Sequence, residues 1–339
     1  MANTNGYLLT VEDLKTYFPV KRGLLRRTIG YVRAVDGISF GIEKGQTLGL
    51  VGESGCGKTT VAQSCVRLVP ATAGKVVFEG TDVLSADRVK LRQIRRQISL
   101  IFQDPYGSLN PRMTVGNIVG EPLRVHKNVS GSELSERIAS LLSKVGLSRR
   151  DINRYPHEFS GGQRQRIGVA RALAVNPALI VADEAVSALD VSIQAQIINL
   201  MVDLQERFGL AYLFITHDLS VVHHISDWVA VMYVGKLVEM AQKETLFFEP
   251  RHPYTEALLS SLPQPDPDIK LQRIIMKGDV ADPANRPSGC CFHPRCLYAR
   301  QICRHEEPPL VNIARDGEPE HLCACHSPEE LSLSGVAAA

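Results

Sequence analysis

The segment LGLVGESGCGKTT, Leu48 to Thr60, constrains the fold of this chain more than any other. A short apolar run leads into the spacing Gly52-x4-Gly57-Lys58-Thr59, and the following TVAQSCVRL predicts a helix. This strand–loop–helix order is typical of a phosphate-binding loop, because its glycines let backbone N–H groups converge on phosphate oxygens at a helix N-terminus. We therefore predict an α/β fold that binds a nucleotide, with Lys58 on the β- and γ-phosphates and Thr59 on Mg²⁺.

The phosphate contacts should come from the loop itself and from the first turn of the helix. We expect the nucleotide to be bound by Gly52, Ser54, Gly55, Cys56, Gly57, Lys58, Thr59 and Thr60. Within this set we interpret Cys56 as a small filler residue and not as a catalytic thiol.

Two further apolar runs end in residues suited to phosphoryl transfer. The run ALIVADE delivers Asp183 and Glu184, and the run LAYLFITHD delivers His217. Open α/β sheets place their ligand chemistry at the carboxyl ends of parallel strands, so we expect these side chains to meet at one site. There Asp183 would hold Mg²⁺, while Glu184 and His217 would act on the attacking water.

Composition narrows the classes of partner. A formal net charge of +2 gives no electrostatic reason to expect nucleic acid, and the basic runs KRGLLRR and RVKLRQIRR are interpreted as solvated faces. The first residues lack a basic start followed by an apolar core, so no secretory signal is expected. No apolar run approaches the roughly 18 residues of a membrane span. We expect a cytosolic chain whose thiols stay reduced.

The segment RYPHEFSGGQRQRIGVARAL carries a family resemblance. Its residues Phe159 to Gln163 resemble the signature of the ATP-binding cassette (ABC) family. The order of motifs along the chain matches that family throughout: the phosphate loop, Gln103, the signature, Asp183-Glu184, Ser187-Ala188-Leu189-Asp190 and His217. The resemblance implies a P-loop NTPase core of ABC type, with an antiparallel β subdomain and a helical signature subdomain. It further implies that Gln103 joins Thr59 and Asp183 at Mg²⁺ and that Asp190 belongs to the nucleotide site.

The same resemblance implies that each ATP lies between two chains. Ser160, Gly161, Gly162 and Gln163 form a second phosphate-binding helix start, which is redundant within one chain. In the family this signature completes the site of a partner subunit, so we expect these residues to contact the γ-phosphate that the partner holds. Phe18 in LKTYFPV matches the aromatic residue that stacks on adenine, with Tyr17 as the competing choice.

A closer resemblance covers residues 8–325, nearly the whole chain. The segments FQDPYGSLNPRMTVG, SALDVSIQAQIINLMVDLQ and RHPYTEALLS look like those of the ATPase subunits of bacterial dipeptide and oligopeptide importers. This implies ATP hydrolysis at the cytoplasmic face of the inner membrane, with a second ATPase subunit, two transmembrane permease subunits and, indirectly, a periplasmic solute-binding protein. We interpret His252-Pro253-Tyr254 as a structural turn. One departure is Ala185, since these importers usually have Pro after the catalytic Glu.

Two alternatives stay open. The first alternative is that the chain serves an importer of nickel or another solute, because an ATPase subunit does not touch the solute and its sequence cannot distinguish them. The second alternative is a soluble ABC ATPase that acts on nucleic acid or ribosomes. DNA-repair members of that class carry long coiled-coil insertions between loop and signature, whereas Lys58 and Ser160 here are only 102 positions apart, without heptads.

The chain divides into three segments by its patterns. We predict an ABC-type ATP-binding domain over residues 8–258, an importer-type C-terminal extension with a Cys cluster over 259–327, and a disordered tail over 328–339. The boundary follows from the rise in proline density after LLSSLPQPDPDIK. Residues 104–160 predict the helical subdomain, with SGSELSERIASLLSKVGL as an amphipathic helix. The apolar spacing in DVSIQAQIINLMVDLQERFG predicts a second helix that ends at Gly209. The segment VAVMYVGKLVEMA predicts a hairpin around Gly235.

Six of the eight cysteines lie near the C-terminus. Disulfides conflict with a cytosolic chain, and the spacing does not match the paired thiolates of a zinc ribbon, although His293, His321 and His326 keep Zn²⁺ as an alternative. A 4Fe–4S cluster needs four thiolates, one for each iron. The importer resemblance implies such a cluster, with Cys290, Cys296, Cys303 and Cys325 as ligands by position and Cys323 as the competing fourth ligand. Since phosphoryl transfer needs no electrons, we predict a structural role for it.

Overall fold

The computed structural model describes residues 6–23, 27–104, 107–127, 129–262 and 273–336. It falls into two units that interleave along the chain. The first consists of Met1–Leu9, Ile42–Thr47 and Phe78–Ile215, and the second of Thr10–Gly41, Leu48–Val77 and Thr216–Ala339. In the described residues, no helix combines the length and the apolar character needed to cross a bilayer.

Parallel strands form the centre of the first unit. Strand β7 (Leu179–Asp183) pairs on one side with β6 (Ile98–Ile101) and on the other with β8 (Ala211–Ile215), with Asp183 opposite Ile215. Every residue of β7 and β8 is buried. Strands covered on both faces are apolar throughout, which is why ALIVADE and LAYLFITHD show no alternation. The structure confirms both predicted strands.

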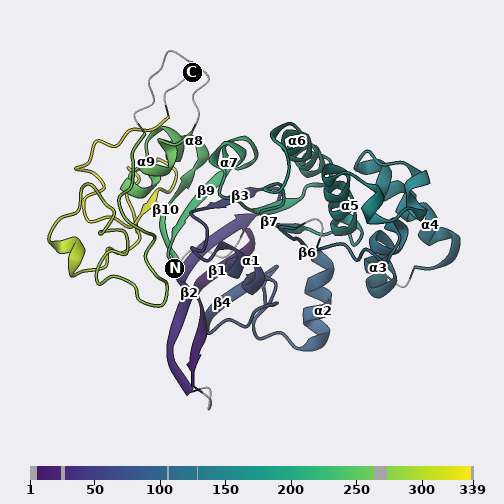
Figure 1. Ribbon diagram of the computed structural model, residues 1–339, viewed down its shortest axis with the longest axis horizontal. Helices are drawn as coiled ribbons and strands as arrows, with labels where there is room; N and C mark the ends of the chain where they lie inside the picture. The colour runs from purple at the N-terminus through teal and green to yellow at the C-terminus, as the bar shows by residue number, and fades with distance from the viewer. Residues whose placement is uncertain (1–5, 24–26, 105–106, 128, 263–272, 337–339) are drawn as a thin grey trace. The chain divides into compact units, whose positions relative to one another are not determined.

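Helices make up most of the rest of this unit. They are α2 (Arg88–Gln97), α3 (Val115–Lys127), α4 (Gly131–Lys144), α5 (Gly161–Leu173) and α6 (Val191–Phe208), with the short 3₁₀ segments η1 (Arg149–Asn153) and η2 (Pro156–Glu158) and the two-residue strand β5 (Thr81–Asp82). Helix α3 packs against α4 and α5 (Figure 1). The predicted amphipathic helix is α4, whose buried residues are Ile138, Leu141 and Leu142. Helix α6 ends at Gly209 in the left-handed region (φ 63°), as predicted.

The second unit contains further strands. Strands β1 (Tyr7–Arg22), β2 (Arg27–Glu43) and β4 (Ala73–Phe78) lie in one sheet, with β1 between the other two. Strand β3 (Thr47–Val51) runs parallel to β9 (Trp228–Tyr233), which forms an antiparallel hairpin with β10 (Lys236–Gln242). Short strands β12 (Leu322–Cys323) and β11 (Val311–Asn312) extend this sheet from β10. The predicted hairpin is confirmed; its turn uses positive φ at Val234 and Gly235.

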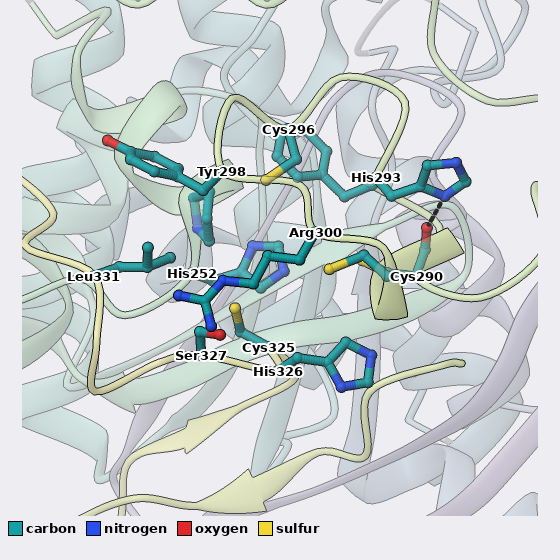
Figure 2. Close-up of a pocket in the computed structure, with 13 residues that line it drawn as sticks. His252, Cys290, His293, Cys296, Tyr298, Arg300, Cys325, His326, Ser327 and Leu331 are labelled. Carbon is teal, nitrogen blue, oxygen red and sulfur yellow. Dashed lines mark hydrogen bonds between the residues drawn. The ribbon is translucent and has the colours of Figure 1, made fainter. Parts of the chain in front are cut away.

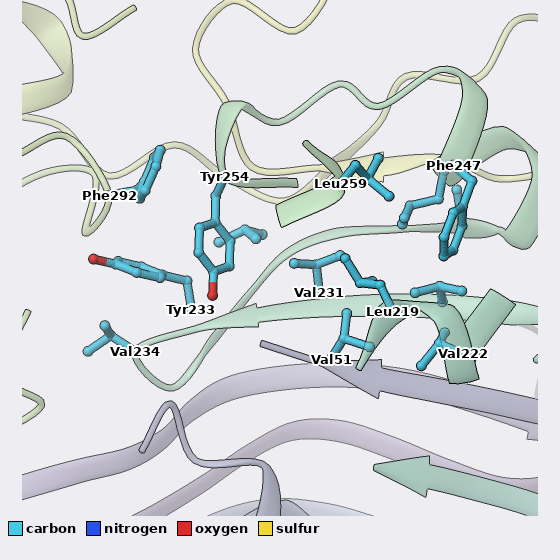
Figure 3. Close-up of a cluster of buried hydrophobic side chains, with 14 residues drawn as sticks. Val51, Leu219, Val222, Val231, Tyr233, Val234, Phe247, Tyr254, Leu259 and Phe292 are labelled. Atoms are coloured by element: carbon cyan, nitrogen blue, oxygen red, sulfur yellow. The ribbon is translucent and has the colours of Figure 1, made fainter. Parts of the chain in front are cut away.

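One hydrophobic cluster holds the hairpin, the neighbouring helices and the cysteine-rich segment together. The helices are α7 (Leu219–Ile225), α8 (Lys243–Phe248) and α9 (Pro253–Leu259), and α1 (Lys58–Cys65) follows β3. Tyr233, Tyr254 and Phe292 meet at one end of the cluster, as Figure 3 shows, and Leu219, Val222 and Phe247 lie at the other. Cys290, Cys291 and Cys296 pack against it. The cysteine-rich segment therefore shares its apolar core with the hairpin.

The end of the described chain makes specific contacts. Residues 273–336 contain β11, β12 and the 3₁₀ turn η3 (Ile302–Arg304). The N–H of Val336 donates to the carbonyl of Phe247 (2.8 Å), and the N–H of Ser334 donates to Glu256 (2.8 Å). Ser334 and Val336, which belong to the segment 328–339 predicted as a disordered tail, thus have hydrogen-bond partners. Residues 337–339 of that segment and residues 263–272 of the predicted extension lie outside the described residues.

Candidate functional site

The phosphate-loop residues connect β3 to α1, as predicted. A Cβ on Gly52 (φ 154°) would lie 2.1 Å from the carbonyl oxygen of Met232, and one on Gly57 (φ 108°) would lie 2.0 Å from the carbonyl oxygen of Ala34. Only glycine fits at such distances and at such φ values. The spacing of the glycines is therefore required by the close approach of the loop to the backbone around it, in addition to any phosphate contact.

Lys58 is held inside this loop. Its ammonium donates to the carbonyl oxygens of Gly52 (2.7 Å) and Glu53 (3.0 Å), and the side chain is buried. The thiol of Cys56 lies 3.8 Å from the same ammonium. Burial raises the pKa of Cys56 even though the Lys58 charge opposes that shift. A buried, protonated thiol is a poor nucleophile, which agrees with the interpretation of Cys56 as a filler.

Glu184 and Gln103 meet directly. Nε2 of Gln103 donates to Oε2 of Glu184 over 2.7 Å, and the N–H of Glu184 donates to the carbonyl of Ile215 over 2.8 Å. The backbone of Glu184 has φ 46°, an uncommon conformation for a residue other than glycine. Asp183, directly before it, is buried. The end of β7 thus holds both carboxylates within one segment, as the sequence predicts.

His217 and the loop belong to the same unit. His217 follows Thr216, whose N–H donates to the carbonyl of Leu50 (3.3 Å). Leu50 lies on β3, the strand that leads into the loop. The side chain of His217 is exposed. His217 thus follows a residue that is bonded to the strand leading into the loop, and its role at a γ-phosphate stays a prediction.

The signature residues begin α5 with reciprocal caps. The Ser160 side chain accepts from the N–H of Gln163, and the Gln163 side chain accepts from the N–H of Ser160, which satisfies two N–H groups of the helix start. A Cβ on Gly162 would lie 2.4 Å from Cγ2 of Ile193 on α6. Only glycine fits at position 162, because α5 and α6 pack closely there. The side chain of Ser160 is exposed. Asp190 is the N-cap residue of α6 and makes no side-chain cap.

The two aromatic candidates for adenine differ in their surroundings. The hydroxyl of Tyr17 donates to Asp36, whereas Phe18 is 40% exposed. Asp36 also accepts from Arg286 (2.5 Å). Burial of Asp36 favours its protonated form, but the bonds from Tyr17 and Arg286 and the charge of Lys236 outweigh it and lower its pKa. The hydroxyl of Tyr17 is thus bonded to the Asp36–Arg286 ion pair, whereas the ring of Phe18 is exposed, and the choice of Phe18 for adenine stays a prediction.

Four cysteines line one pocket in the C-terminal segment: Cys290, Cys296, Cys303 and Cys325. Figure 2 shows the sulfur atoms of three of them, Cys290, Cys296 and Cys325, on different sides of this pocket, with His252 and His326 nearby. Burial raises the pKa of Cys290 to about 12 and of Cys296 to about 11. Within the described residues, no three His, Cys, Asp or Glu side chains are grouped as ligands of a single metal ion would be.

The other two tail cysteines are placed differently. Cys323 lies in β12 opposite Glu239 and is fully buried, and burial raises its pKa. Cys291 faces a second pocket, which Lys236 and Glu307 also line. Neither residue lines the four-cysteine pocket. His252, predicted to belong to a turn, instead caps α9, with its Nδ1 accepting from the N–H of Tyr254 (3.1 Å).

Sequence reasoning missed the residues that hold Glu53 of the phosphate loop. Arg295 donates to both carboxylate oxygens of Glu53 (2.6 and 3.1 Å), and the hydroxyl of Tyr254 accepts from the N–H of Glu53 (2.9 Å). Glu53 and Arg295 are 242 positions apart, and neither lies in a periodic pattern. No local signal could have paired them.

Two family models match this chain. The model described as ABC transporter matches residues 35–187, and the model described as oligopeptide/dipeptide transporter, C-terminal region, matches residues 238–303. The second match includes most of β10, helices α8 and α9, and three of the pocket cysteines.

Curated relatives match along most of the chain. The oligopeptide transport ATP-binding protein AppF of Bacillus subtilis (strain 168) is 52% identical over 94% of this chain and 97% of its own length. The dipeptide transport ATP-binding protein DppF of Haemophilus influenzae is 47% identical over 95% of this chain and 97% of its own length. A solved dimeric ATP-binding cassette, MJ0796 bound to ADP and Pi, superposes with a TM-score of 0.62 at 28% identity, covering 69% of this chain and 98% of that one.

Proposed function

Since this chain belongs to the family of ABC transporter ATP-binding proteins for oligopeptides and dipeptides, and is therefore an ATPase, we propose that it energises the import of short peptides across a bacterial inner membrane. The observation that carries this proposal is similarity over 94% of the chain to an oligopeptide transport subunit, including the C-terminal region that marks peptide transporters. Peptide-binding proteins and permeases deliver the solute, so this chain contributes ATP chemistry alone.

The residues of the chain have distinct roles in that chemistry. Lys58 leaves the carbonyls of Gly52 and Glu53 to bind the β- and γ-phosphates, and the loop N–H groups bind the remaining oxygens. By resemblance to the family, Thr59, Gln103 and Asp183 would hold Mg²⁺, which would neutralise charge on the phosphates. Glu184 then polarises the attacking water, with His217 against the γ-phosphate. The bond from Gln103 to Glu184 supports this arrangement, because it keeps an Mg²⁺ ligand and the base adjacent.

The ATP site is completed by a second subunit. Ser160, Gly161, Gly162 and Gln163 start a helix whose N–H groups and dipole suit a phosphate. The chain already has one phosphate-binding helix start at Lys58, so the second serves the nucleotide of a partner ATPase. The dimeric form of the similar cassette supports this proposal. Phe18 stacks on adenine, and Asp190 lies at the same interface.

We place the chain at the cytoplasmic face of the membrane, bound to two permease subunits. ATP closes the ATPase dimer, hydrolysis opens it, and the permeases follow the motion. The names of the relatives, which are transport ATP-binding proteins, support such partners.

We propose that the four-cysteine pocket holds a 4Fe–4S cluster, for which Cys290, Cys296, Cys303 and Cys325 would be the ligands. A single tetrahedral Zn²⁺ would bring its thiolates within about 4 Å of one another, given a Zn–S bond of about 2.3 Å. Within the described residues no three candidate ligands are grouped for a single metal ion, so the proposal rests on the number of thiols around the pocket, since a cluster takes one thiolate for each of four irons. Cys325 lines the pocket and Cys323 does not, which supports Cys325 as the fourth ligand.

Such a cluster supplies covalent links between segments that have few apolar residues of their own. Two of the proposed ligands, Cys290 and Cys296, pack on the hydrophobic cluster, which supports this role. Protein purified without oxygen should contain about four irons per chain and absorb visible light, and Cys303→Ser should lose both. Stoichiometric zinc without visible absorbance contradicts the cluster and restores the zinc alternative.

Transport itself is tested by reconstitution. The chain, co-expressed with the permeases and solute-binding protein encoded beside it, should drive uptake of labelled dipeptides or oligopeptides into vesicles in an ATP-dependent manner. Uptake of nickel ions with no uptake of peptides would refute the peptide proposal and leave the ATPase assignment intact.

A further inference from the structure

Glu53 is fixed at all of its polar groups. Its N–H donates to Tyr254 (2.9 Å), its carbonyl accepts from Lys58 (3.0 Å), and its carboxylate accepts both bonds of the Arg295 guanidinium (2.6 and 3.1 Å). All of these residues belong to the second unit. Two partners of Glu53 come from the C-terminal part of the chain, another is the phosphate-binding lysine, and the N–H of Cys56 also donates to the Glu53 carbonyl (3.2 Å).

The ion pair of Glu53 and Arg295 is largely shielded from water. The Arg295 side chain is 8% exposed and that of Glu53 is 24% exposed. The hydrogen bonds that Arg295 donates to Glu53 raise the pKa of Arg295 further, so the guanidinium stays charged. A bidentate, charge-assisted pair in such surroundings fixes both position and orientation of the carboxylate. A surface pair, screened and flexible, would not do this.

Arg295 is in turn held by the cysteine segment. It precedes Cys296, and its N–H donates to the carbonyl of Phe292 (3.0 Å). The Phe292 ring packs on the rings of Tyr254 and Tyr233, with centroids 5.3 Å from each (Figure 3). Both Arg295 and Tyr254 are thereby placed by the group of residues that packs beside the four-cysteine pocket.

We propose that Arg295 and Tyr254 are positioning residues for ATP binding, which transmit the order of the four-cysteine pocket to the phosphate loop through Glu53. This inference rests on the proposed role of the loop and of the pocket. The carbonyl of Glu53 is one of two acceptors that hold the Lys58 ammonium. When Glu53 is fixed, the loop keeps the conformation that receives phosphate, so it loses less conformational entropy when ATP binds. When it is released, the affinity for ATP falls.

The first test compares three variants in the full chain by titration with MgATP, in a Glu184→Gln background that prevents hydrolysis. Arg295→Met should weaken ATP binding about tenfold, since it removes a buried charge-assisted pair. Tyr254→Phe, which removes only a hydroxyl, should weaken it about threefold. Arg304→Met is the matched control: Arg304 is exposed in the same segment, and its variant should bind like the parent.

A double variant separates positioning from general damage. Glu53→Gln combined with Arg295→Met should bind ATP no more weakly than Arg295→Met alone, because both act through one pair. Arg295→Lys, which keeps the charge but loses the second bond, should recover part of the affinity. In the assembled transporter with Glu184 intact, Arg295→Met should raise KM for ATP with kcat retained. Additive losses in the double variant, or equal losses in Arg304→Met, overturn the proposal.

The link to the cysteines has its own test. Cys303→Ser should weaken ATP binding severalfold in the parent and cause no further loss in the Arg295→Met background. Unchanged affinity in Cys303→Ser with its metal lost overturns the link. The variant Lys58→Ala distinguishes this inference from the proposed function. Normal ATP affinity in Lys58→Ala refutes the phosphate-loop assignment itself. If Lys58→Ala loses ATP affinity while Arg295→Met keeps it, only the positioning role is refuted.

Discussion

The side-chain amide of Gln103 donates a 2.7 Å hydrogen bond to the carboxylate of Glu184. The backbone of Glu184, directly after β7, is held in a left-handed conformation by its own bond to Ile215. The carboxylate is therefore oriented by a residue of another segment, as the proposed general base must be. The backbone conformation is adopted although Ala185, and not Pro, follows Glu184.

Glu184→Gln should leave ATP affinity unchanged and slow hydrolysis at least about a hundredfold, because the amide cannot polarise the attacking water. The amide occupies the same volume, so the bond with Gln103 persists in altered form. Phosphate release by the assembled transporter and the population of closed ATPase dimer are the measurements. A variant that hydrolyses ATP at nearly the parent rate would show that another group acts as the base.

Ser160→Arg should abolish transport, because the bulky side chain occupies the place of the partner's γ-phosphate. This variant also loses the cap of α5, at a cost of about 1 kcal/mol in the free energy of unfolding. Ser160→Asp separates the effects, since Asp caps a helix well yet repels phosphate. Both variants should bind ATP at their own loop. Transport by Ser160→Asp at the parent rate would argue against a shared site.

Gly162→Ala should lower the free energy of unfolding by about 1–3 kcal/mol, because the new methyl overlaps Cγ2 of Ile193. In an Ile193→Ala background, the same change should cost less than about 0.5 kcal/mol, since Ala is the better helix former. Gly168→Ala in the same helix, where a Cβ meets no atom within 4 Å, is the control and should stabilise the chain. Equal effects at both glycines, measured by urea unfolding, would rule out the packing explanation.

Acid should destabilise the chain through His252. Burial lowers the pKa of this imidazole from 6.5 to about 4, against the attraction of Glu239. Between these pH values the unfolded chain binds the proton and the folded chain does not, so the free energy of unfolding falls as the pH falls. The contribution reaches at most about 3 kcal/mol at 1.36 kcal/mol for each pKa unit.

His252→Asn provides the comparison for this pH effect. Asn accepts a hydrogen bond at a helix start, as Nδ1 of His252 does from Tyr254, but it does not titrate. Urea unfolding at about pH 7 and about pH 4.5 should show a smaller loss of stability in the variant than in the parent. Parallel losses would mean that other groups cause the acid sensitivity.

The sequence alone determined the features that are local in the chain. Glycine spacing, apolar runs and capping side chains each specify one such feature within some twenty residues. These features are the phosphate loop, the buried strand β7 that leads into Asp183 and Glu184, the capped start of α5 and the hairpin at Gly235. The comparison with a known family then supplied roles for these motifs, since roles depend on a ligand that the sequence does not contain.

Only the tertiary structure decided which distant residues meet. The pairing of Arg295 with Glu53, the placement of Cys325 and not Cys323 in the pocket, and the contact that excludes a side chain at Gly162 each join segments far apart in the sequence. No periodicity connects such residues, because a charge, a thiol or a glycine has the same local preferences whichever partner it finds. Their meeting follows from how the cysteine segment packs on Tyr233, Tyr254 and Phe292, and from how α5 packs on α6.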